Sequence, residues 1–138
     1  MAGLHDLTTL IAQMSPVLNE GHFGFAHVAT VEEATVLAPI MVFQEAEAVT
    51  VILEWDAAVA QGLAPEFPCC WITLNVHSAL DAVGFLARVV ARLAALGMGV
   101  NPVAGFYHDH LFLPYDRAAD AMEALHAMAA EAKAQLDA

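Results

Sequence analysis

The chain has 138 residues, a formal net charge of −12 and a mean hydropathy of +0.60. This length fits one compact domain or two very small fused ones. Such a strong negative charge repels phosphate backbones and anionic lipid headgroups, so we expect neither nucleic acids nor membranes as partners. No apolar run approaches the roughly 18 residues that a membrane-spanning helix needs.

The two cysteines, Cys69 and Cys70, are adjacent. Neighbours in sequence rarely meet the geometry of a disulfide. We therefore expect two small buried side chains and a reducing, cytoplasmic location.

The first half of the chain begins with a helical pattern. Apolar residues spaced i, i+3, i+4 and i+7 predict a helix that Asp6 caps and Pro16 stops. A strand is expected over Phe23–Ala29, after a turn at Glu20 and Gly21. The acidic stretch 30–35 is interpreted as a loop.

Two further strands and a short helix complete this half. Val, Ile, Phe and Trp enrichment predicts strands at Ile40–Glu45 and Val49–Trp55, joined by a tight turn. A short helix is expected over Ala57–Gln61. The stretch 64–68 is the best candidate for a linker.

In the second half, alternating apolar residues predict a strand over Trp71–His77. Ser78, with Asp81 three residues later, indicates a helix start, and this helix is expected to run to Leu96. The positions predicted to be buried on it are Leu80, Val83, Ala87, Val90 and Ala94. Phe85 is placed on the solvent side with Arg88 and Arg92, which hints at a contact surface.

A β-hairpin follows, with strands in Val100–Phe106 and His110–Leu113. Its turn is predicted to hold the polar run 107–110. A last helix is expected from Asp116, because apolar residues recur in steps of four and three up to Leu136.

The predicted order of elements is α-β-β-β-α followed by β-α-β-β-α, which suggests a diverged internal duplication. The second set is the ferredoxin-like split βαβ unit without its last strand. The missing strand is expected to come from the other half or from a second chain.

Four stretches resemble one known family, that of short bacterial proteins built from ACT domains. The opening His5, Asp6 and Leu7 is similar to its T-D-L type of opening. Pro39–Ala48, Trp71–Leu80 and Tyr107–Pro114 are similar to its blocks P-x-x-x-F-R-E-A-E-G, W-I-T-L-x-V-H-S-S-L and Y-H-D-H-L-F-V-P. Gln44 and Ala48 depart from the first block, where Arg and Gly are expected, and this removes a cation from the N-terminal half.

The resemblance implies an α+β fold of tandem ferredoxin-like (ACT-like) units, with antiparallel sheets and helices packed on one face. It implies an N-terminal unit over residues 1–66 and a C-terminal ACT domain over residues 67–138. The implied function is regulatory and non-catalytic binding of a small molecule, most often an amino acid, by a homodimer. The residues at the implied ligand site, together with a nearby acid, are His77, Ser78, Leu80, Gly97, Gly99, Asn101 and Asp109.

Residue chemistry gives these positions plausible roles. A helix that starts at Ser78 would offer free N–H groups to a carboxylate. Asn101 can donate and accept hydrogen bonds, whereas Asp109, Glu45 or Glu47 could meet an ammonium group. The alternative roles are a plain helix cap for Ser78 and a turn residue for Asn101.

His108 and His110 are weak candidates for a metal site, with His77 as a third ligand. A hairpin turn with satisfied polar groups is the alternative, and we expect no cofactor. No catalytic motif is present, so we expect no enzyme. The alternative function is an oligomerisation or protein-docking module without a ligand, to which an exposed sheet edge would contribute.

Overall fold

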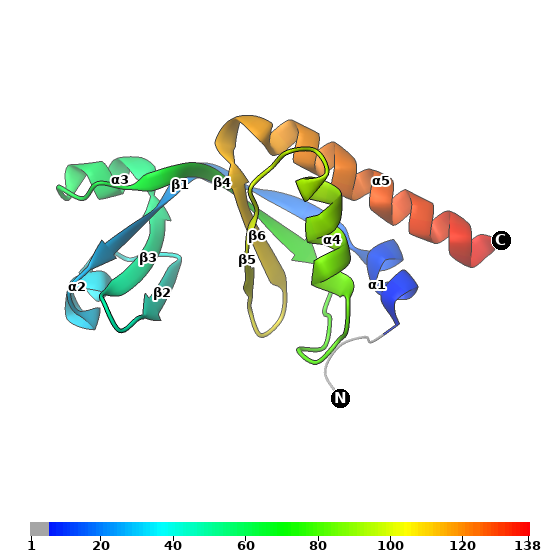
Figure 1. Cartoon of the computed structure of the whole chain (residues 1–138), viewed down its shortest axis with the longest axis horizontal. Coiled ribbons are helices and arrows are strands. Elements are labelled where there is room, and N and C mark those ends of the chain that lie inside the picture. Colours follow the sequence, from blue (N-terminus) through cyan, green and yellow to red (C-terminus); the bar gives the residue numbers. More distant parts are fainter. Residues whose placement is uncertain (1–5) are drawn as a thin grey trace.

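The computed structural model describes residues 6–138 and contains one six-stranded antiparallel sheet with the strand order β2-β3-β1-β4-β6-β5. The strands are β1 (Ser15–Val28), β2 (Met41–Gln44), β3 (Val49–Glu54), β4 (Glu66–Asn75), β5 (Asn101–Ala104) and β6 (Asp109–Pro114). The helices are α1 (Leu7–Gln13), α2 (Val31–Val36), α3 (Trp55–Ala60), α4 (Phe85–Ala94), the 3₁₀ turn η1 (Tyr115–Arg117) and α5 (Ala118–Asp137). Figure 1 shows α2 and α3 at one end and α1, α4 and α5 at the other.

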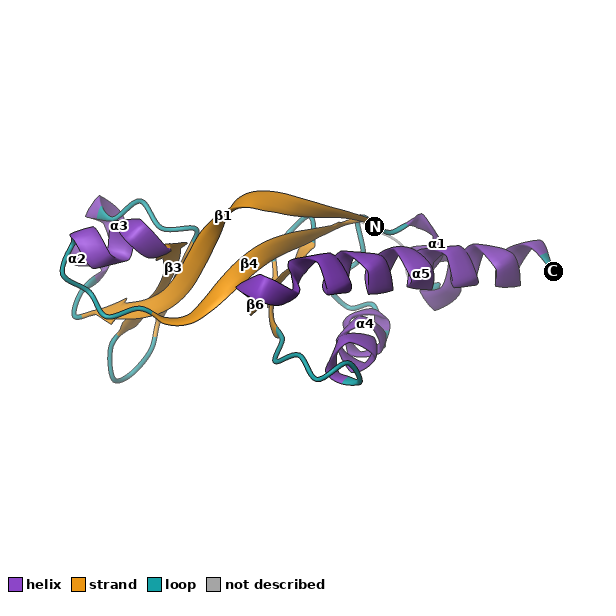
Figure 2. Cartoon of the chain, turned by 90° about the horizontal axis from the view of Figure 1, so that it is seen from above, coloured by secondary structure: helices purple, strands orange, loops and turns teal. Residues whose placement is uncertain are grey.

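The long strands β1 and β4 connect two units. The second part of β1 pairs with β3, and its first part, from Ser15 to Asn19, pairs with β4. Figure 2 shows both strands running the length of the sheet. The strand that the second unit lacks in sequence order is therefore supplied by the start of β1, from the same chain.

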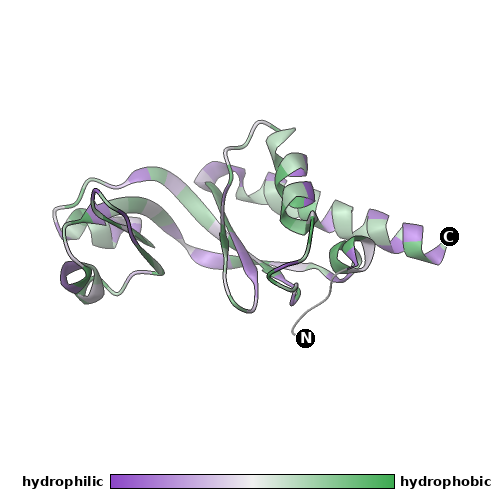
Figure 3. Ribbon diagram, turned by 60° about the horizontal axis from the view of Figure 1, so that its bottom comes forward, coloured by the Kyte–Doolittle hydropathy of each residue, from purple (hydrophilic) through white to green (hydrophobic). Residues whose placement is uncertain are grey.

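Three apolar clusters fill the structure. The largest lies between β4, β6 and helices α1, α4 and α5, and a second lies between α2, α3 and strands β1 and β3. A third, with Phe23, Ile52 and Phe112 at its centre, lies on the other face of the sheet. Figure 3 shows mostly hydrophobic ribbon interrupted by hydrophilic positions, most visibly towards the C-terminus. The tandem ferredoxin-like arrangement predicted from the sequence is confirmed.

Several element predictions hold. Asp6 caps α1 by accepting a 2.9 Å hydrogen bond from the Thr9 amide. The strands β2 and β3 lie where they are expected. Cys69 and Cys70 are free and buried, as predicted, and burial raises the pKa of the Cys69 thiol to about 12.

Other predictions are wrong. Residues 31–36 form α2 rather than a loop. The N-cap Thr30 accepts from the Glu33 amide, and the Glu33 carboxylate accepts from the amide of Ala29, one residue before the position that a standard capping box uses. β1 begins at Ser15, well before the predicted strand. β4 begins at Glu66, inside the stretch interpreted as a linker.

Helix α4 differs most from its prediction. It starts at Phe85, after Gly84 at φ +89°, so Ser78 does not cap it. Its buried positions are Phe85, Val89 and Leu93, whereas Leu80 and Val83 precede the helix and are 70% and 86% exposed. The segment carries apolar residues on two neighbouring faces of the helix, and the face with Phe85, Val89 and Leu93 is the one that packs into the core.

Candidate functional site

The two hairpins of the sheet have the same geometry. β2 pairs with β3 from Met41↔Ile52 to Gln44↔Val49, and β5 pairs with β6 from Asn101↔Phe112 to Ala104↔Asp109. Each turn is closed by one backbone hydrogen bond, of 3.0 Å in the first and 2.9 Å in the second. Each residue of the second hairpin thus lies 60 positions after its counterpart, which supports an internal duplication.

Comparison of the two hairpins identifies one position whose residue differs in a way that packing alone does not explain. Val49 is buried against α2, and its counterpart is Asp109, which is 9% exposed. Asp109 is the one buried charged residue among residues 6–138. Burying a carboxylate is costly unless it is paired, so an acid at this position points to a role beyond the core.

Within the described chain, Ser78 is the one hydrogen-bond partner of the Asp109 side chain, donating from Oγ to Oδ2 over 3.3 Å. Burial raises the pKa of Asp109, and this shift is opposed by the Ser78 hydrogen bond and by His110 and His108. Among the described residues, the buried Asp109 carboxylate therefore has a single hydrogen bond, from Ser78.

Asp109 lines a cavity of about 170 Å³. The wall opposite is the segment between β4 and α4, with the first turn of α4. The lining residues are Ser78, Ala79, Leu80, Ala82, Phe85, Leu86, Ala104, Gly105 and Asp109. The cavity thus combines apolar walls with one hydroxyl and one carboxylate, and its volume suits only a small molecule.

The predicted site residues divide into two groups. Ser78, Leu80 and Asp109 line this cavity together. His77 does not line it, and the centre of its ring lies 5.7 Å from that of the Tyr107 ring. Gly97, Gly99 and Asn101 lie at the other end of β5. Asn101 is three residues from Ala104, which is roughly 10 Å along a strand.

The histidines lie in and beside β6. The predicted turn was wrong here: it comprises residues 105–108, and Asp109 and His110 belong to β6. His110 Nδ1 accepts a 3.0 Å hydrogen bond from the Trp71 indole, since that N–H can only donate. Within residues 6–138 there is no group of three or more His, Cys, Asp or Glu side chains that could hold a metal.

Sequence reasoning missed the other cavity residues. Gly105 has a clear structural reason, because an added Cβ would lie 2.9 Å from the His108 carbonyl oxygen. Phe85 and Leu86 were missed with the true start of α4. Gly84, which adopts a left-handed conformation directly before Phe85, was the signal that could have placed that start.

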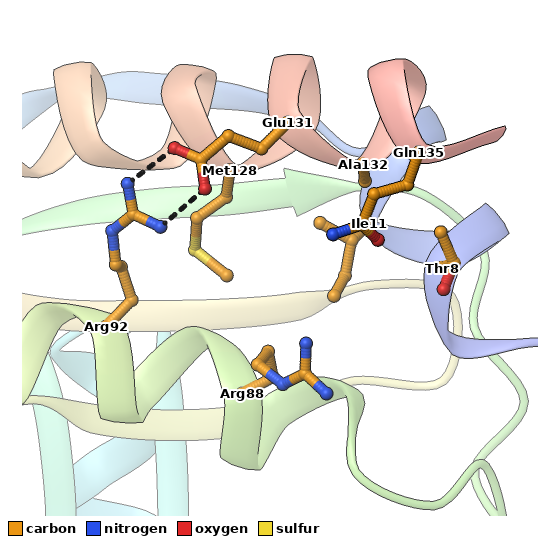
Figure 4. A pocket seen from close by; sticks show the side chains of 8 residues that line it. All are labelled: Thr8, Ile11, Arg88, Arg92, Met128, Glu131, Ala132 and Gln135. Atoms are coloured by element: carbon orange, nitrogen blue, oxygen red, sulfur yellow. Dashed lines mark hydrogen bonds and ion pairs between the residues drawn. The ribbon is translucent and has the colours of Figure 1, made fainter. Parts of the chain in front are cut away.

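A second, smaller cleft of about 80 Å³ lies between α1, α4 and α5 (Figure 4). Arg92 forms a two-pronged ion pair with Glu131 there, with N–O distances of 3.0 and 2.9 Å. Arg88 of α4, Thr8 of α1 and Gln135 of α5 also line the cleft. It shares no lining residue with the cavity at Asp109.

Two models of the ACT domain match the chain, over residues 2–70 and 66–127. The chain belongs to the ACT domain family. The resemblance stated from the sequence is therefore confirmed. ACT domains are regulatory modules, and the matches show no catalytic family.

Solved structures agree with this assignment. A Vibrio cholerae protein of unknown function, described as a possible transport protein, is 38% identical, covers 89% of this chain and 95% of its own, and superposes with a TM-score of 0.82. An Agrobacterium tumefaciens protein is 17% identical over 84% of this chain and 89% of its own, with a TM-score of 0.71. The ligand-free regulatory subunit of aspartate kinase from Thermus thermophilus is 12% identical over 83% and 97%, with a TM-score of 0.59. The last two similarities show the fold alone.

No curated protein sequence matches the chain. In the part of the chain that the structure describes, no helix combines the length and apolar character needed to span a bilayer.

Proposed function

We propose that this ACT protein is a non-catalytic regulator that binds a small amino acid in the cavity at Asp109. The observation that carries the proposal is the buried Asp109 carboxylate, which lines a cavity and replaces the apolar Val49 of the sister unit. An ammonium group would give this carboxylate the charged hydrogen bond that Ser78 alone does not.

The carboxylate of the ligand would bind at the start of α4, at Phe85, and not at a helix start at Ser78 as predicted from the sequence. Phe85 and Leu86, in the first turn of α4, line the cavity, and no side chain caps this helix start. The free N–H groups and the positive dipole end of a helix favour a negative group. A zwitterion would thus lie between β6 and the start of α4, with its side chain against Leu80 and Ala104.

We further propose that a second copy of the chain covers the cavity. Leu80 lines the cavity and is 70% exposed, and Phe106 and Tyr107, which follow the lining residue Gly105 in the hairpin turn, are 64% and 65% exposed. Exposed aromatic residues of this kind are common at interfaces. The proposed homodimer would act in the cytoplasm, in keeping with the two free cysteines.

A thermal-shift screen of the twenty amino acids tests the function, since a ligand that binds only the folded state raises the melting temperature. We expect a shift with at least one small amino acid, and its loss in Asp109→Asn. Light scattering of the same samples tests the dimer. If no amino acid shifts the wild-type protein while it scatters as a dimer, the alternative of an oligomerisation module without a ligand would replace the proposal.

A further inference from the structure

Two of the four lysine and arginine residues of this acidic chain, Arg88 and Arg92, line the second cleft. A third, Arg117, lies outside this cleft, at the N-cap of α5. Arg92 is paired with Glu131, and Arg117 with Asp120 at 2.9 Å. Within residues 6–138, Arg88 has neither a hydrogen bond nor an ion pair.

The spacing along the two helices explains why Arg88 has no acid. Arg88 lies one helical turn before Arg92 on α4, and Gln135 lies one turn after Glu131 on α5. All four residues line the cleft. A glutamate at position 135 would repeat the pair that Arg92 makes, but the sequence has a neutral amide there.

The remaining polar groups of the cleft are hydrogen-bond donors as well. Arg88 contributes a planar guanidinium, Gln135 an amide NH₂ and Thr8 a hydroxyl. Figure 4 shows Arg88 on one side of the opening and Thr8 and Gln135 on the other, with the apolar Ile11 between them. Donors around an apolar floor suit a planar oxyanion that carries a short carbon chain.

We propose that this cleft is a second site, which binds the carboxylate of a small organic acid through Arg88, with Gln135 and Thr8 as further donors. A volume of about 80 Å³ admits a carboxylate with one or two carbons and excludes a nucleotide. The net charge of −12 repels anions at long range, but over a Debye length of roughly 8 Å at physiological ionic strength the nearby guanidinium dominates.

Titration of the ¹⁵N-labelled protein with sodium acetate, at constant ionic strength, tests the proposal. We expect saturable amide shifts around Arg88 and Gln135, and binding weaker by roughly tenfold in Arg88→Gln, the cost of one charged hydrogen bond. Arg117→Gln is the matched control, because it removes the same charge from an arginine that is already paired. It is expected to bind acetate as the wild type does.

A second variant keeps the test decisive if Arg88→Gln folds poorly. Gln135→Glu should supply an internal carboxylate to Arg88, raise the melting temperature and abolish the acetate shifts. Asp109→Asn should leave acetate binding unchanged, so failure of the amino-acid site and failure of this site are distinguishable. The proposal is overturned if acetate gives no saturable shift, if Arg117→Gln weakens binding as much as Arg88→Gln, or if inorganic phosphate binds and acetate does not.

Discussion

Asp109 occupies in the second hairpin the position that Val49 occupies in the first. Val49 is paired between Val28 and Gln44, and Asp109 between Leu74 and Ala104, in the same register. The two hairpins thus keep one geometry, while a buried valine in the first corresponds to a buried carboxylate in the second. The ligand site is accordingly expected in the C-terminal unit alone, with one site per chain.

The first prediction concerns the stability of the ligand-free protein. Burial raises the folded-state pKa of Asp109 above the ordinary value of 3.8, so the folded state holds this proton more tightly than the unfolded state. The free energy of unfolding should therefore decrease as the pH rises from about 3.8 through the raised pKa. Asp109→Asn should unfold at higher denaturant concentration than the wild type at pH 7, and the difference should shrink towards acidic pH.

Glu47→Gln is the control for this measurement, because Glu47 is an exposed acid in the turn of the first hairpin. Its effect on stability should be within about 0.5 kcal/mol at any pH. An Asp109→Asn variant that is less stable than the wild type at pH 7 would show that the carboxylate is satisfied within the chain.

The second prediction concerns the protonation of His110. Burial lowers the pKa of His110, and the Trp71 indole N–H donates to its Nδ1, so the neutral ring carries its proton on Nε2. This pKa should lie below 6.5 in an NMR titration, and the Trp71 indole resonance should move with it. Because the unfolded state binds this proton more readily, His110 should reduce stability as the pH falls below 6.5. A titration at or above 6.5 would contradict the hydrogen bond.

The third prediction tests the strand at Ser15–Asn19. The Asn19 amide donates to the Trp71 carbonyl over 3.2 Å and to Thr73 Oγ1 over 2.9 Å. Asn19→Ala should lower the free energy of unfolding by about 1–2 kcal/mol, measured by urea denaturation. Asn75→Ala, at an exposed position of β4, is the control and should be nearly neutral.

The fourth prediction tests which face of α4 is buried. Leu93 is fully buried, so Leu93→Ala should cost about 2–5 kcal/mol of unfolding free energy. Leu80→Ala, at a position that is 70% exposed, should cost less than about 0.5 kcal/mol. Equal losses in thermal or urea unfolding would favour the face predicted from the sequence.

The hairpins were predictable because runs rich in β-branched and aromatic residues flank short breaks in the pattern, although the turn of the second hairpin lies two residues earlier than predicted. The start of β1 was not predictable, because Pro16, Asn19 and Gly21 suggest a turn. Its residues form a strand because β4 offers a partner across Ser15–Asn19, a contact between residues more than 50 positions apart. Local pattern carries no information on such pairing, and tertiary contacts decide it.

The candidate site was predictable only in part, because the sequence pattern indicated Ser78 and Asp109 but not the start of α4. Ser78 and Asp109 belong to motifs shared with ACT proteins, and the structure brings them together. Gly97 and Asn101 belong to the predicted site because the ACT resemblance implies a ligand close to the loop between the first helix and the second strand of the unit. The late start of α4 places the cavity at one end only, and the sequence signal for that, Gly84, competes with a good capping pattern at Ser78.

Calorimetric titration with the amino acid that gives the largest thermal shift tests the central claim most directly. The account predicts one site per chain in the wild type, loss of roughly tenfold or more in affinity in Asp109→Asn, and unchanged binding in Glu47→Gln. Two sites per chain, or equal affinity in wild type and Asp109→Asn, would contradict it.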